Sequence, residues 1–137
     1  MSNHRITDNL DSLFEVLPPE ISQAINENGK NSDLIEIILD LGRVPTARFT
    51  NEEVELSDIE VTEKIIKFVV DRIGKFDGDN RAGLARTLHR IAAIRNRMGK
   101  IVGLTCRVGR AVYGTTEIVK DLIESGKSLL ILGRPGV

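Results

Sequence analysis

The residues best suited to chemistry stand at the end of the chain. An apolar segment, residues 128–132, runs directly into a glycine-rich turn made of Gly133, Arg134, Pro135, Gly136 and Val137. Phosphate-binding loops begin in this way, because small residues let successive backbone N–H groups point at one anion. The full loop reads Gly, four variable residues, Gly, Lys and then Ser or Thr. Gly133 fits the first position and Val137 the last variable one, so the pattern predicts half of a phosphate-binding loop.

Catalysis by such a loop needs residues that would follow Val137. The Lys reaches the β- and γ-phosphates of a nucleotide, and the Ser or Thr binds the metal ion. We therefore expect the 137-residue chain to be inactive in nucleotide hydrolysis and to bind neither ATP nor Mg²⁺ well. Phosphate release above background from the purified chain would contradict this expectation.

A block of positive charge is the second candidate. Residues 81–110 hold seven Arg, one Lys and no acidic residue, whereas residues 1–80 hold 17 acidic and 8 basic residues. The net charges are +8 and −9, and the whole chain has −1. Cations without a local carboxylate must pair with acids elsewhere in the fold, with phosphates or with water.

The elements that position these arginines are predicted to be strands. Residues 88–97 and 101–110 form the arms of a hairpin that turns at Met98 and Gly99. Arg95 and Arg97 would share one strand face, as would Thr105 and Arg107, so a pleated sheet would present guanidinium groups in rows.

The rest of the pattern indicates an α+β fold. Residues 10–17 and 21–25 predict a helical hairpin, and residues 34–41, 47–49 and 54–56 predict strands, although the first of these also fits a buried helix. Residues 65–73 predict an amphipathic helix capped by Thr62 and ended by Gly74. Residues 77–83 predict a loop.

Three parts follow from this order of elements. Residues 1–30 form the helical hairpin, residues 31–114 an α+β domain with flanking helices and the basic β-ribbon, and residues 115–137 the start of a further unit. In the last part, Thr115 or Thr116 would cap a helix that ends at Gly126, followed by a strand over residues 128–132. Its apolar residues would pack inward: Ile118, Val119, Leu122 and Ile123.

Several segments together resemble one family. In order, they resemble cyanobacterial and plastid-encoded P-loop ATPases related to stage III sporulation protein AA. The resembling segments are residues 78–83, 86–91, 93–97 and 103–111, extended by residues 39–43, Pro45, residues 47–49 and residues 130–137. The resemblance implies a chain cut inside the Walker A motif, with a PAS-like amino-terminal domain, only the first strand of a RecA-like core, and ATP with Mg²⁺ bound by the full-length protein.

The same resemblance implies a hexameric AAA-type ring in which arginines of this domain approach nucleotide phosphates at a subunit boundary. Carried onto this sequence, the candidates are Arg95, Arg97, Arg107 and Arg110. A guanidinium fork suits this role because it keeps its proton and offers two donors to a phosphate. Residues 31–114 would then close on the motor.

Two other classes of function remain open. A nucleic-acid-binding module would use residues 81–110, although four Phe and one Tyr leave little for base stacking. A ligand-free assembly domain would set the acidic first half of one subunit against the basic ribbon of the next.

The remaining residues favour structural roles. Cys106 is predicted to be a buried packing thiol and His89 a paired strand residue, and no metal centre is expected. No apolar run reaches the roughly 20 residues of a membrane span. A cytoplasmic or plastid-stroma location is expected.

Overall fold

The computed structural model describes residues 5–7, 9–113, 120–128, 130, 132 and 133. The chain divides into two compact units, residues 8–110 and residues 1–7 with 111–137. In chain order the elements are β1 (Arg5–Thr7), α1 (Leu10–Val16), α2 (Pro19–Asn28), η1 (Asn31–Asp33), β2 (Leu34–Asp40), β3 (Thr46–Phe49), β4 (Glu53–Glu55), α3 (Glu63–Ile73), β5 (Arg81–Gly83), β6 (Arg90–Arg95), β7 (Ile101–Arg107), β8 (Ala111–Tyr113) and α4 (Lys120–Glu124).

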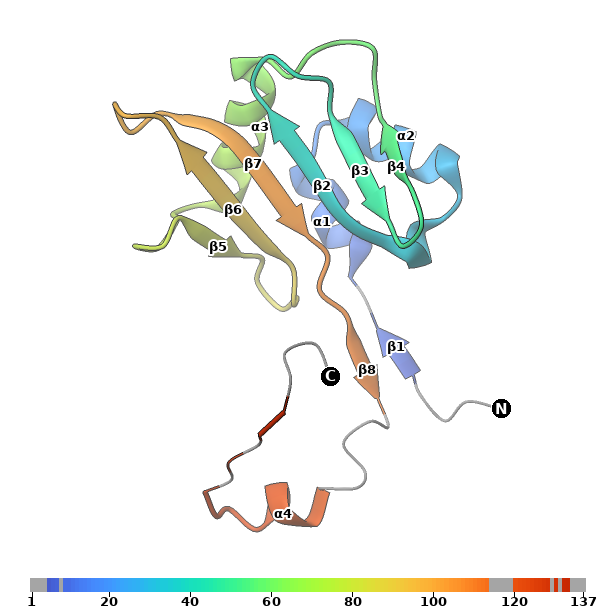
Figure 1. Cartoon of the computed structure of the whole chain (residues 1–137), viewed down its shortest axis with the longest axis vertical. Helices are drawn as coiled ribbons and strands as arrows, with labels where there is room; N and C mark the ends of the chain where they lie inside the picture. Colours follow the sequence, from blue (N-terminus) through green and yellow to red (C-terminus); the bar gives the residue numbers. More distant parts are fainter. Residues whose placement is uncertain (1–4, 8, 114–119, 129, 131, 134–137) are drawn as a thin grey trace. The chain divides into compact units, whose positions relative to one another are not determined.

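The larger unit is built on a six-stranded sheet of order β4-β3-β2-β7-β6-β5, in which every neighbouring pair is antiparallel. Figure 1 shows α1, α2 and α3 together behind one face of this sheet. The predicted α+β fold with flanking helices is therefore confirmed. In the smaller unit, β1 pairs with β8.

The helices begin and end where the sequence provides the signals. Pro19 stands at the start of α2, and Gly29, with φ of 77°, ends it in the left-handed region. The Thr62 hydroxyl accepts a hydrogen bond from the backbone N–H of Ile65 at 3.4 Å, which caps α3. Gly74, with φ of 86°, ends α3. The predicted helical hairpin, cap and stop are thus confirmed.

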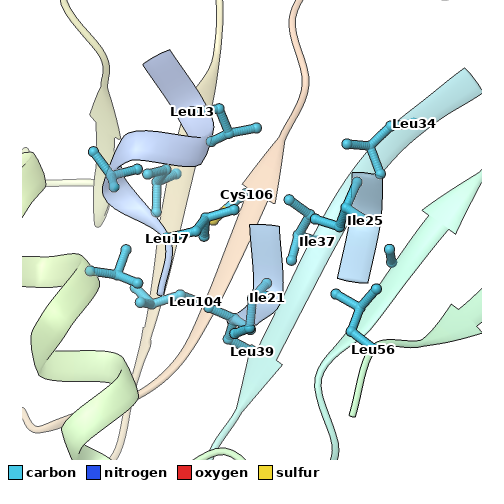
Figure 2. Close-up of a cluster of buried hydrophobic side chains, with 14 of the residues drawn as sticks. Leu13, Leu17, Ile21, Ile25, Leu34, Ile37, Leu39, Leu56, Leu104 and Cys106 are labelled. Carbon is cyan, nitrogen blue, oxygen red and sulfur yellow. The ribbon is translucent and has the colours of Figure 1, made fainter. Parts of the chain in front are cut away.

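The core lies between the helices and the inner face of the sheet. Figure 2 shows Leu13 and Leu17 beside Ile21 and Ile25, facing strand residues that include Ile37, Leu39, Leu104 and Cys106. All of these side chains are buried. Each buried Leu or Ile contributes about 1.5–3 kcal/mol, so this layer holds the helices on one side of the sheet.

Three local predictions differ from the structure. Residues 81–83, predicted to be a loop, form edge strand β5. Leu122 and Ile123 of α4 are 55% and 51% exposed, so they do not pack inward. Residues 128, 130 and 132, the described part of the predicted final strand, lie in no strand, and the predicted caps Thr115 and Thr116 lie outside the described residues.

No helix among the described residues is both long enough and apolar enough to cross a membrane.

Candidate functional site: the open face of the sheet

The face of the sheet opposite the three helices, here called the open face, is built from alternate strand residues. Strand register sets them in three cross-strand rows. The first row is Glu53, Arg48, Glu36, Arg107, Arg90 and Gly83. The second row is Glu55, Thr46, Ile38, Thr105, Ala92 and Arg81. The third row is Asp40, Gly103 and Ile94.

Charge is divided across this face. The cationic half, on β5, β6 and β7, carries Arg81, Arg90 and Arg107 and no carboxylate. The acidic half, on β2, β3 and β4, has one cation in its rows, Arg48, and four carboxylates: Glu36, Asp40, Glu53 and Glu55. The segregation seen along the sequence is thus repeated on one surface.

The cationic half contains a like-charged pair. Arg90 and Arg107 stand directly opposite each other on β6 and β7, and both are exposed. Opposed like charges on one sheet face destabilise it. Within the described part of the chain, neither guanidinium makes an ion pair or a hydrogen bond. This half of the face therefore presents unneutralised positive charge.

The acidic half is partly neutralised internally. Glu36 is 8% exposed, and its carboxylate pairs with the Arg48 guanidinium at 3.2 Å. Asp40 lies over Gly103, where a Cβ atom would stand 2.6 Å from the Asp40 carboxylate. Glycine at this position leaves room for that carboxylate.

The open face carries two apolar residues, Ile38 and the 50% exposed Ile94, and residues of its rows line two hollows. One hollow, of about 510 Å³, is lined by Ile38, Asp40, Arg43, Val44, Thr46 and Glu53. The other, of about 420 Å³, is lined by residues of β5, β6 and the preceding loops, including Arg81, Gly83 and Arg90. The three rows contain no aromatic residue. The face thus offers charge and shape but no ring for base stacking.

The four arginines proposed as phosphate sensors do not form one group. Arg107 lies on the open face. Arg95, at the end of β6, donates from Nε to the Asn80 side-chain oxygen at 2.8 Å and from its guanidinium to the Gly99 carbonyl at 2.7 Å. Arg97 is exposed in the hairpin turn, outside the strand predicted for it.

Arg110 fastens two distant segments together. Its half-buried guanidinium donates to the Leu34 carbonyl at 2.5 Å and to the Asn31 carbonyl at 2.8 Å. These bonds tie the start of η1 and the start of β2 to the residues after β7. The position of Arg110 is explained by this structural role.

His89 forms a second tie. It is buried, its Nδ1 accepts from the Gly109 N–H at 3.0 Å, and its Nε2 lies 2.9 Å from the Asn9 carbonyl, so Nε2 carries the proton. Gly109 permits this approach, since a Cβ atom there would stand 2.0 Å from the Leu88 carbonyl oxygen. The ring is therefore fully engaged in joining the start of α1 to the end of β7.

Sequence reasoning missed Arg81, Arg90 and Glu36 as members of the surface. A signal for Arg90 was present: the Gly99 turn sets β6 against β7, and counting back from the turn places Arg90 opposite Arg107. Glu36 gave no such signal, because its neighbour β7 lies far along the chain.

The remaining candidates are Cys106, the glycine-rich residues 133–137 and a metal site. Burial raises the pKa of the Cys106 thiol from 9.0 to about 12, so it stays protonated and unreactive, and the prediction of a buried thiol is confirmed. Gly133 is exposed, and residues 134–137 lie outside the described residues. Within the described ranges, no three His, Cys, Asp or Glu residues gather as a metal site would require.

Comparison with known proteins finds three relatives. The chain is 48% identical over 132 residues to the uncharacterized protein ycf45 of Porphyra purpurea. It is 47% identical over 131 residues to protein SEEDLING PLASTID DEVELOPMENT 1 of Arabidopsis thaliana, and 40% identical over 132 residues to the ycf45 protein of Cyanidium caldarium. Each alignment covers 96% of this chain but only 23%, 19% and 39% of the respective relative.

These comparisons correct the resemblance to P-loop ATPases. No protein-family model matches the chain, no solved structure matches it, and the relatives carry names that say nothing of ATP. The assignments of ATP binding, a nucleotide-binding P-loop, a cut Walker A motif and an AAA ATPase were therefore wrong. The hexameric ring stays a prediction. Residues 133–137 match only the first five positions of the phosphate-loop pattern, and a glycine-rich turn of this kind does not by itself specify a nucleotide.

The chain is thus similar to ycf45 and SEEDLING PLASTID DEVELOPMENT 1 proteins, and it spans between about a fifth and two-fifths of the length of these relatives.

Proposed function

We propose that this chain is an assembly domain that self-associates through its open face. The observation that carries the proposal is the division of that face into a cationic half and an acidic half. Each half would meet its opposite on a second copy, since charge complementarity steers and orients association. Apolar residues set among charged ones, as on this face, are common in a protein interface.

Nucleic acid is the less favoured partner. A nucleic acid on the cationic half would lie beside Asp40, which stands on the neighbouring strand β2 and repels phosphates. The rows of the open face also lack the aromatic rings on which single-stranded bases stack. Both features fit a protein partner.

Sedimentation of the purified chain across a salt series tests the proposal. We expect oligomers at about 50 mM salt that dissociate as salt rises, because exposed charges are screened within about 8 Å at 0.15 M. Arg107→Glu should abolish the oligomers. Lys64→Glu is the matched control, since Lys64 is exposed on α3, which lies behind the opposite face of the sheet.

Two results would overturn the proposal. One is a monomer at every salt concentration. The other is a low-salt gel shift with single-stranded RNA that Arg107→Glu removes while the protein alone stays monomeric, which would favour the nucleic-acid function.

We place this activity in the plastid stroma. Support comes from the Arabidopsis thaliana relative, which is named for plastid development. Import of a fluorescent fusion of a full-length relative into plastids checks this location, and a cytoplasmic signal would contradict it.

A further inference from the structure

We infer that two copies of the chain pair face to face about a two-fold axis that runs parallel to the strands, between β2 and β7. This inference rests on the proposed function and names the geometry of its complex. The axis passes through the middle of the six-stranded order, with three strands on each side. Rotation about it reverses the strand order while each cross-strand row stays level with its counterpart.

The second row shows the charge match most simply. Reversal places β4 of one copy over β5 of the other, so Glu55 faces Arg81 of the second copy. Both residues are exposed, and neither side chain has an ion-pair partner within the described part of its own chain. Symmetry makes this contact twice.

The first row adds charged contacts. Glu36 faces Arg107 of the second copy. Glu53 faces Gly83, which lines the hollow together with two cations, Arg81 and Arg90, and one carboxylate, Asp77. One pair is unfavourable, because Arg48 faces Arg90. Its cost is lowered by the Glu36 carboxylate, which holds Arg48 at 3.2 Å.

The third row matches shape. Reversal places β6 over β3, so the 50% exposed Ile94 of one copy comes level with the 510 Å³ hollow of the other. That hollow is lined in part by Ile38, Val44 and Thr46, which offer apolar contacts to a branched side chain. A large exposed apolar residue and a hollow of suitable lining are thereby brought together by the same rotation that pairs the charges.

The size of the face sets the strength of the pair. Five interstrand spacings of about 4.8 Å and strands of about five residues give roughly 400 Å² per copy. A standard stable interface buries about 800 Å² per partner. We therefore expect a dimer that forms at micromolar concentration and is sensitive to salt.

Charge reversal at the second row tests the geometry. Glu55→Arg alone places two like-charged Arg pairs in the interface, and Arg81→Glu alone places two Glu pairs there. We expect each single variant to dimerise at least tenfold more weakly. An equimolar mixture of the two variants restores both pairs with opposite charges, and the double variant in one chain does the same, so each should recover the dimer to within threefold. Glu60→Arg, exposed in the loop before α3, is the control and should dimerise normally.

Analytical ultracentrifugation at low salt separates the outcomes. Recovery of a two-copy mass by the mixture supports the inference and shows that both variants are folded. Recovery of a larger closed ring, or no recovery while the unmodified chain still associates, overturns the two-fold arrangement and leaves the assembly function standing. An unmodified chain that is monomeric at every salt concentration overturns both.

The variant Ile94→Asp tests the shape match independently. It should weaken the dimer without altering the charge pairs between Glu55 and Arg81. An unchanged dimer mass for this variant would contradict the shape match.

Discussion

The two faces of the six-stranded sheet differ in how far their side chains are buried. On the inner face, alternate residues such as Ile37, Leu104 and Cys106 are fully buried beneath three helices. On the open face, their immediate neighbours Ile38, Thr105 and Arg107 are left partly or wholly exposed by the rest of the chain. A one-residue step along a strand therefore moves a side chain from the buried core to the exposed open face.

The difference indicates that the inner face determines the stability of the fold and that the open face would determine the choice of partner. Burial of apolar area supplies most of the free energy of folding, whereas exposed charges add little to it and instead set which surfaces approach. Substitutions on the two faces should therefore separate folding from association.

The largest effect is expected on the inner face. Leu104→Ala removes a fully buried side chain from the central strand β7 and should lower the free energy of unfolding by about 2–5 kcal/mol. Its neighbour Thr105→Ala, on the open face, should cost less than about 1 kcal/mol. Urea titration followed by circular dichroism measures both, and equal costs would break the contrast between the faces.

The next effect is a pH dependence that belongs to the inner face. The pKa of Cys106 is raised to about 12 in the folded chain, so the unfolded chain loses this proton first as pH rises above 9.0. Stability is thus fully present below pH 9 and is lost progressively up to about pH 12. At pH 10 the loss should be about 1.4 kcal/mol. Cys106→Ala should show a flatter alkaline slope in the same titration, and an identical slope would argue against the burial of the thiol.

A smaller effect is expected where the open face is most crowded. Gly103→Ala places a Cβ atom 2.6 Å from the Asp40 carboxylate, which is the free end of a side chain and can turn away. We expect a loss of about 1 kcal/mol. Adding Asp40→Ala should recover most of it in a double-mutant cycle, whereas strictly additive losses would place the strain elsewhere.

The smallest effect concerns the ion pair within the acidic half. Glu36→Gln keeps the shape of the side chain but removes the charge that holds Arg48. Since Arg48 is half exposed, the loss of stability should stay below about 1 kcal/mol. The same variant should weaken the proposed self-association, because Glu36 would face Arg107 of the second copy in that pair. If Glu36→Gln strongly lowered the free energy of unfolding and left self-association unchanged, Glu36 would serve the stability of the fold and not association.

Local patterns were sufficient for the elements that are locally determined. The Thr62 cap, the apolar spacing of residues 65–73 and the Gly99 turn, with φ of 83°, act within a few residues of themselves. The strand prediction for residues 34–41 was also right for Leu34–Asp40, because β-branched residues fit a central strand.

Relations between distant residues were out of reach. Strand β5 has only three residues and owes its existence to pairing with β6. The position of β2 between β3 and β7, which creates the first row of the open face, follows from tertiary packing. The bonds of Arg110 to the carbonyls of Asn31 and Leu34 span more than seventy residues. The charge pattern of the sequence can single out an arginine such as Arg110, but it cannot show which distant groups that arginine binds.

The placement of β2 beside β7 has a consequence for synthesis on the ribosome. Arg107 follows its cross-strand partner Glu36 by 71 residues. At roughly 5–20 residues per second, about 4–14 seconds pass between the appearance of the two strands. Throughout that interval one edge of β2 has no strand to pair with, and its apolar side is only partly covered. A nascent chain stalled before Ile101 should accordingly bind a chaperone that recognises extended apolar segments, and should release it once β7 has emerged.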